Sequence, residues 1–230
     1  MPTRLAKLVI TVLAVLVDLV LPIRCAGCGE RGIPICLRCA ATFAGPFPVR
    51  RPGLAHGPPA FALAEYQGAA RTALLAYKER GRRDLAGVLG RTMAAVLPWL
   101  PGAGPDVDGT WWLVPAPSRA TEARRRGGWH LVRLARAVAC ALAAAGHPAV
   151  VAPALRLAGP ARDSVGLTAA ARAANLAGRI RLRPEGSPPR GTPVILLDDV
   201  IASGATATAC AAELTAAGLN VTAVLTLTAV

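Results

Sequence analysis

Two adjacent carboxylates at the end of an apolar run offer the clearest chemistry in the chain. Residues 194–197 are four consecutive apolar residues, which predicts a strand covered on both faces, as in a parallel sheet. Asp198 and Asp199 follow directly, at the strand end where sheets of this kind bind ligands. Because an ionised carboxylate can only accept hydrogen bonds, the pair suits a ligand that carries adjacent hydroxyl donors.

Small residues follow the acidic pair and lead into a predicted helix over residues 206–217. Ser203, Gly204, Ala205 and Thr206 would expose backbone N–H groups there, which together form a favourable seat for a phosphate. A ribose 5-phosphate meets both requirements. The plainer interpretation, in which the acids merely end a strand and Ser203 or Thr206 caps a helix, stays open. The chain contains no P-loop motif and no glycine-rich dinucleotide motif after a strand.

This segment resembles the phosphoribosyl pyrophosphate (PRPP) motif of type I phosphoribosyltransferases, in which two acidic residues precede a short Thr/Ser/Gly loop. The resemblance implies that Asp198 and Asp199 hold the ribose hydroxyls and are the catalytic residues. It also implies that the 5′-phosphate is wrapped by the loop of Ala202, Ser203, Gly204, Ala205 and Thr206.

Basic residues are the expected partners of the pyrophosphate that leaves in such a reaction, because its charge must be neutralised. Residues 119–136 carry six arginines against Glu122 alone. By the same resemblance, pyrophosphate is held by a loop after an early strand and by a mobile cationic loop, here Ala116, Pro117, Ser118 and Arg119, then Arg124, Arg125 and Arg126. A second basic cluster contains Lys78, Arg80, Arg82 and Arg83. Each of these groups could instead lie on a solvated helix face.

Four cysteines near the beginning of the chain have the spacing of a metal site. Cys25, Cys28, Cys36 and Cys39 form two C-x2-C pairs separated by seven residues. Four thiolates can surround one Zn²⁺ tetrahedrally and leave no open position, which predicts a structural ion. A disulfide pair and a redox C-x-x-C site are the alternatives. We do not expect the first because no cleavable secretion signal is expected, and we do not expect the second because the motif lacks its usual βαβ setting. Cys140 and Cys210 are expected to be small buried hydrophobes.

Three Pro- and Gly-rich stretches, residues 45–59, 98–109 and 184–193, divide the chain and act as boundaries or surface loops. Helical and strand-like segments alternate between them, which predicts an α/β architecture. We expect an apolar helix over residues 1–22, a four-cysteine module over 23–45 and a main domain over 60–230. Besides residues 194–197, strands are expected over 61–66, 111–114, 150–155 and 221–228, and mostly helical segments over 71–97 and 119–145.

Charge and hydropathy bear on which partners the protein binds and where in the cell it is located. Lys and Arg number 26 against 13 Asp and Glu, and the resulting +13 suits polyanionic partners, although Arg is abundant throughout the chain. Residues 8–21 resemble a signal peptide or membrane anchor. This run is short for a span, Asp18 interrupts it, and no small-residue cleavage site follows. Arg24 before Cys25 disfavours a lipoprotein site. We therefore expect a cytoplasmic protein, with membrane attachment as the less favoured alternative.

The order of the motifs resembles the ComF family over nearly the whole chain. The cysteine pairs are followed by YKERGRRDLAGVLG, VPAPS…RRRG, LTAAARAANLAG and VILLDDVIASGAT. This resemblance implies a type I phosphoribosyltransferase-like parallel sheet flanked by helices, with a small N-terminal zinc ribbon, and a link in some bacteria to DNA uptake. Two segments depart from the family pattern. Residues 163–166 lack a Gln that is common in relatives, and Gly128-Trp129-His130 stands where relatives usually have an aromatic residue or His followed by Asn or Asp. His130 is expected on a helix surface rather than as a general base.

These observations predict an enzyme that transfers a 5-phosphoribosyl group from PRPP to a nitrogenous base, or back. Mg²⁺ would be carried mainly by pyrophosphate oxygens. A fold alone does not specify a reaction, so a non-catalytic sensor of PRPP or a nucleotide is a second hypothesis. A third is an accessory factor that binds single-stranded DNA or competence proteins, although aromatic residues for base stacking make up only 4% of the chain.

Overall fold

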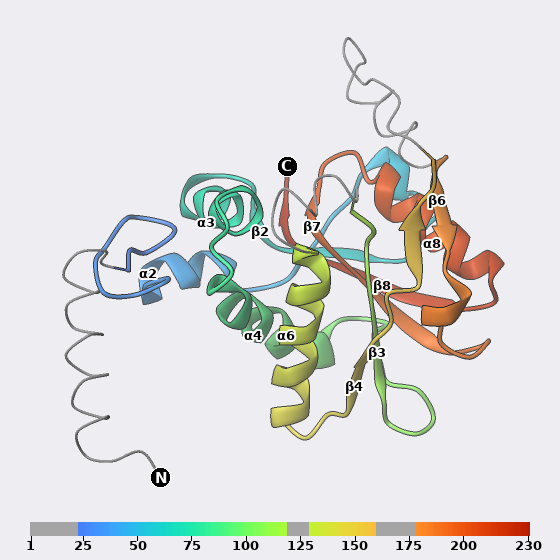
Figure 1. Ribbon diagram of the computed structural model, residues 1–230. Coiled ribbons are helices and arrows are strands. Elements are labelled where there is room, and N and C mark those ends of the chain that lie inside the picture. Colours follow the sequence, from blue (N-terminus) through green and yellow to red (C-terminus); the bar gives the residue numbers. More distant parts are fainter. Residues whose placement is uncertain (1–22, 119–128, 160–177) are drawn as a thin grey trace.

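The computed structural model describes residues 23–118, 129–159 and 178–230, which Figure 1 shows in colour. Three sequence-based predictions fall outside this part of the chain: the apolar helix over residues 1–22, the departure at residues 163–166, and the placement of Arg119, Arg124, Arg125 and Arg126. Among the described residues, no helix has the length and apolar character needed to cross a membrane.

A six-stranded, mostly parallel sheet organises the main domain. Its strands are β1 (Phe47–Pro48), β2 (Ala60–Glu65), β3 (Trp111–Pro115), β4 (Ala149–Val151), β7 (Pro193–Ile201) and β8 (Asn220–Ala229). They lie in the order β1-β2-β8-β7-β3-β4, and every neighbouring pair is parallel except β1 and β2. This confirms the predicted α/β class with a parallel sheet.

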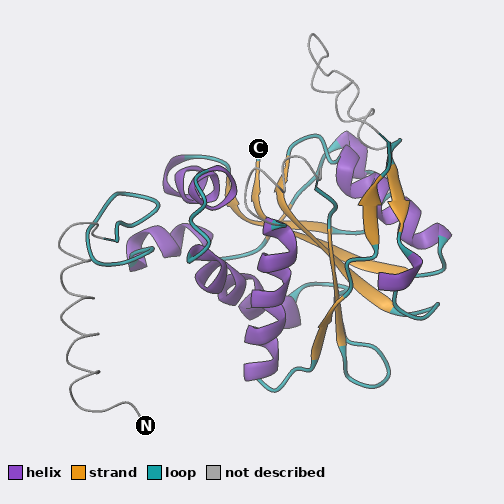
Figure 2. Ribbon diagram, in the orientation of Figure 1, coloured by secondary structure: helices purple, strands orange, loops and turns teal. Residues whose placement is uncertain are grey.

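The central strand β7 is covered on both faces, as its sequence predicts. Residues 194–197 are completely buried. Helix α8 (Ala205–Ala216) packs on one face of β7 and β8, while α3 (Gly68–Glu79), α4 (Leu85–Val96) and α6 (His130–Ala144) cover the other face (Figure 2). Burial of apolar residues from both directions explains why an unbroken apolar run is stable here.

Helix α6 shows how the sequence pattern selects a buried face. Its buried apolar side chains recur at helical spacing and form one stripe: Leu131, Leu134, Ala135, Val138 and Leu142. Helix α4 packs closely against the same helix, because Gly90 has no side chain. A Cβ at Gly90 would lie 2.6 Å from the Cβ of Ala137. Cys140 lies away from this stripe and is exposed, so the expectation that it is buried was wrong, whereas Cys210 on α8 is buried as predicted.

The connections around β3 and β7 leave the sheet in opposite directions. From β7 the chain passes through α8 to β8 on one side, and α6 precedes β4 on the other side of β3. Parallel α/β sheets bind ligands at such a switch point, in the crevice outside the carboxyl ends of the strands. The two strand ends are joined directly, because the backbone N–H of Ala116 donates to the carbonyl of Leu197 at 2.8 Å.

The single strand expected over residues 150–155 was wrong. The chain forms β4, then a turn, then β5 (Leu155–Leu157), which pairs with β6 (Ile180–Leu182) in a separate antiparallel ribbon. Pro153 lies in the turn and cannot donate to a ladder, which accounts for the interruption.

The remaining described elements are one short helix and four 3₁₀ turns. Helix α2 (Leu37–Ala40) and the 3₁₀ turn η1 (Ala41–Phe43) belong to the four-cysteine module, residues 23–45, which lies beside α3 and α4 (Figure 1). Of three further 3₁₀ turns, η2 (Pro52–Leu54) and η4 (Pro184–Gly186) lie in loops, whereas η3 (Leu97–Trp99) directly continues α4.

Candidate functional site

The acidic pair lies near the carboxyl end of β7, and both side chains are buried. Consecutive residues of a strand point to opposite faces of the sheet. The Asp199 side chain accordingly meets α3 and α6, whereas Asp198 faces α8. On that side, burial and the charge of Asp198 together raise the pKa of Cys210. The two carboxylates are adjacent in sequence but differ in their surroundings.

Two donors hold Asp199. The Nζ of Lys78, from α3, and the Nε2 of His130, at the start of α6, each lie 2.8 Å from the same oxygen, Oδ2. Burial alone would raise the pKa of Asp199, but the hydrogen bond from His130 and the charge of Lys78 together lower it to about 2. The Asp199 carboxylate is therefore a fixed negative charge at neutral pH.

His130 is a buried part of this network, so the expectation of a helix-surface residue was wrong. Its side chain is only 4% exposed. The hydroxyl of Tyr77 donates to the backbone carbonyl of His130 at 2.6 Å and fixes the start of α6. Within the part of the chain that the structure describes, the Nδ1 of His130 has no hydrogen-bond partner. No local sequence signal pointed to this role, because His130 and Asp199 are 69 residues apart.

Asp198 is in the opposite electrostatic situation. Burial and the neighbouring charge of Asp199 raise its pKa to about 7. Its Oδ1 accepts the backbone N–H of Asp199 at 2.8 Å. The pair therefore combines a permanent acceptor with a carboxyl that exchanges its proton near neutral pH, a division of roles that is typical of functional carboxylate pairs.

The loop of residues 202–206 turns sharply into α8. Gly204 is the residue before the helix and has φ +84°, a left-handed conformation that favours glycine. A Cβ at this position would also lie 2.6 Å from the Cγ of Leu54. Gly204 has no side chain to cap the helix, and within the described residues the N–H of Ala205 makes only a long contact of 3.4 Å to the Ser203 hydroxyl. A strong side-chain cap of the kind that the plainer interpretation requires is therefore not found among the described residues.

A segment from before the main domain braces this loop. The Nε of Arg51 donates to the carbonyl of Ala202 at 3.1 Å, and its guanidinium also donates to the carbonyl of Val230. The Thr208 hydroxyl donates to the carbonyl of Gly53. A Cβ at Gly53 would lie 2.7 Å from the carbonyl oxygen of Ser203, so close packing requires glycine there. Sequence reasoning missed this brace, because 151 residues separate Arg51 from Ala202.

The residues predicted to hold pyrophosphate are partly assembled at the same edge. Ala116, Pro117 and Ser118 follow β3 beside the carboxyl end of β7, and the backbone of Ala116 is bonded to it. Lys78 lies at the acidic pair. The rest of its basic cluster does not join it, because Arg80 and Arg83 are exposed and Arg82 contacts the four-cysteine module.

The four cysteines come together as their spacing predicts. All four Sγ atoms lie within 4.8 Å of one another, with Cys25 and Cys28 each 3.7 Å from Cys36. These separations are too long for disulfide bonds. Burial opposes ionisation of Cys25, yet backbone hydrogen bonds lower its pKa to about 6, whereas burial raises the pKa of Cys39. Cys39 packs against Gly27, where a Cβ would lie 2.7 Å from its Sγ. The cluster could hold a structural metal ion such as zinc.

No family model matches the chain, and no curated protein matches it either.

Proposed function

We propose that the chain binds PRPP with Mg²⁺ and transfers its 5-phosphoribosyl group to a nitrogenous base, or catalyses the reverse. The observation that carries the proposal is the juxtaposition of a buried carboxylate pair and a helix start that depends on Gly204, at the β3–β7 switch point. The order of motifs that resembles the ComF family supports the same proposal.

Each part of the site has a defined task in this proposal. The N–H groups of the loop at residues 202–206 would bind the 5′-phosphate at the positive end of α8. Asp199, held ionised by Lys78 and His130, would accept a hydrogen bond from a ribose hydroxyl and stabilise positive charge that develops on the sugar. Asp198 would accept a hydrogen bond from the neighbouring hydroxyl when it is ionised, or donate one to that hydroxyl when it is protonated. In the reaction the C1–O bond to pyrophosphate breaks and a C1–N bond to the base forms.

Two metal ions would serve different purposes. Mg²⁺ would bind mainly to pyrophosphate oxygens and neutralise the leaving group, with help from the loop at residues 116–118. Zn²⁺ would occupy the four cysteines and act structurally, because four thiolates fill a tetrahedral site and leave no position for substrate.

Calorimetric titration with Mg²⁺ and PRPP tests the binding site. We expect wild type and Asp108→Asn, which removes an exposed acid away from the site, to bind equally well. Asp198→Asn and Asp199→Asn should each weaken binding by at least about tenfold, the cost of about 1.4 kcal/mol for one hydrogen bond to an ionised group. Equal affinity in all four proteins would refute the assignment.

Pyrophosphate release separates an enzyme from a sensor on the same site. Zinc-loaded protein is incubated with Mg²⁺, PRPP and single purine, pyrimidine or nicotinate-type bases. Release that requires both the base and Asp199 supports transfer. Tight PRPP binding without release from any base would instead support the sensing function.

A further inference from the structure

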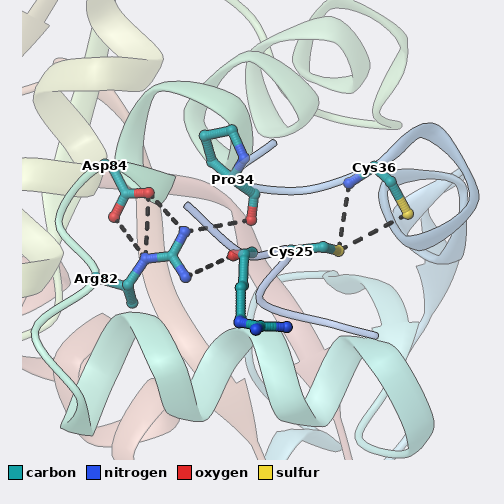
Figure 3. A network of polar contacts seen from close by, with 6 residues as sticks. Cys25, Pro34, Cys36, Arg82 and Asp84 are labelled. Carbon is teal, nitrogen blue, oxygen red and sulfur yellow. Dashed lines mark hydrogen bonds and ion pairs between the residues drawn. The ribbon is translucent and has the colours of Figure 1, made fainter. Parts of the chain in front are cut away.

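Arg82 joins the two halves of the four-cysteine module. One terminal guanidinium nitrogen donates to the carbonyl of Arg24 at 2.8 Å, and the other reaches the carbonyl of Pro34 at 3.4 Å. Asp84 orients the guanidinium through contacts of 2.7 to 3.2 Å, as Figure 3 shows. Arg24 immediately precedes Cys25, and Pro34 lies two residues before Cys36. One side chain thus binds the backbone beside both C-x2-C pairs.

The backbone of the same residue is bonded to α3. A turn at Gly81, with φ +69°, brings the N–H of Arg82 back to the carbonyl of Ala76 at 3.2 Å. Ala76 lies in the last turn of α3, immediately before Tyr77 and Lys78. Arg82 therefore connects the cysteine module, through its side chain, to the end of α3, through its backbone.

The end of α3 is the part of that helix that reaches the acidic pair. Lys78 binds Asp199 at 2.8 Å, and Tyr77 binds the backbone of His130 at 2.6 Å. The module also contacts the beginning of α3, where a Cβ at Gly27 would lie 3.1 Å from the Cβ of Ala69. Helix α3 is thus braced by the module near both of its ends.

We propose that Arg82 is a positioning residue through which the metal-loaded four-cysteine module holds the last turn of α3, and with it Lys78, against Asp199. A metal bound by all four sulfurs would fix the two C-x2-C pairs, and so the carbonyls of Arg24 and Pro34, at the spacing that the Arg82 guanidinium requires. Loss of the metal releases these acceptors and loosens Lys78. Metal binding and occupancy of the acidic site are then thermodynamically linked, and each strengthens the other. Only this last consequence rests on the proposed function.

Hydrogen exchange tests the mechanical part without any substrate. Amide exchange of residues 76–78 is compared in zinc-loaded wild type, chelated wild type, Arg82→Ala and the matched control Arg83→Ala, which removes an exposed arginine next to it. We expect exchange about tenfold faster after chelation and in Arg82→Ala, and unchanged in Arg83→Ala. Equal exchange in Arg82→Ala and Arg83→Ala would overturn the proposal. Should Arg82→Ala not fold, Asp84→Asn, which removes the carboxylate that orients the guanidinium, replaces it under the same criterion.

PRPP affinity tests whether Arg82 acts through Lys78. We expect Arg82→Ala to weaken binding about fivefold, and Arg82→Lys, which keeps one donor, to recover part of the loss. In a Lys78→Gln background Arg82→Ala should add nothing, because the group that it positions is already gone. Additive losses would overturn the pathway through Lys78. Complete absence of PRPP binding in wild type would refute the proposed function, while the exchange experiment would still decide the coupling.

Discussion

Replacing Asp198 by Asn should stabilise the protein at neutral pH, although it should weaken the proposed binding of PRPP. The pKa of Asp198 is raised by burial and by Asp199 from 3.8 to about 7. The folded state therefore binds this proton more tightly than the unfolded state, and stability falls as pH rises through this window. At about 1.4 kcal/mol per pKa unit, the penalty grows from zero near pH 4 to about 4 kcal/mol above pH 7. Asn carries no charge, and its Oδ1 can still accept the N–H of Asp199.

Urea denaturation at pH 5 and pH 8 measures this difference. We expect Asp198→Asn to exceed wild type in unfolding free energy by about 2 kcal/mol at pH 5 and about 4 kcal/mol at pH 8. The exposed Asp108→Asn should match wild type at both values. An Asp198→Asn protein that is no more stable than wild type at pH 8, or an advantage independent of pH, would refute the electrostatic reasoning.

Three further changes test other parts of the structure. Asp199→Asn should lower the unfolding free energy by about 2 kcal/mol at pH 7, because the lowered pKa of Asp199 stabilises the wild-type fold above about pH 4. This difference should disappear toward pH 2, and urea denaturation at several pH values measures it. Gly204→Ala should lower the unfolding free energy by about 2–4 kcal/mol, because it strains the backbone and clashes with Leu54. The control Gly109→Ala, which has a positive φ but open space around it, should lower it by about 1–2 kcal/mol, and thermal melts measure both changes. Cys25→Ser should lower zinc content and melting temperature, and Cys140→Ser should change neither.

The sequence predicted those features of the site whose residues are close together along the chain. The apolar run of β7, the acidic pair and the small residues before α8 are contiguous, so their order alone predicts a strand, its end and a helix start. The two C-x2-C pairs are similarly local, because a short loop between them leaves few ways to separate the sulfurs. In each case the chain length between the parts is too short for the tertiary fold to rearrange them.

The partners of these residues depend on packing between distant segments and were not predictable in the same way. His130 binds Asp199 only because α6 is placed over β7, and Arg51 binds Ala202 only because the segment before β2 folds onto the loop. The exposure of Cys140 has a related cause. The residue type alone suggested burial, whereas the apolar stripe of α6 runs through Leu131, Leu134, Val138 and Leu142 and leaves Cys140 on the opposite side.

The cost of the acidic pair is itself an argument that it serves a ligand. Merely ending a strand would not need two buried carboxylates, and an Asn at position 198 would avoid a penalty of about 4 kcal/mol at neutral pH. The protein instead places Lys78 and His130, from two different helices, on one oxygen of Asp199 and leaves its neighbour close to its own protonation point. Strain of this kind persists where function requires it, because mutation would otherwise remove it easily. A negative group, a carboxyl that exchanges a proton and a helix start that depends on Gly204 are then the three features on which the proposed binding of a sugar phosphate rests.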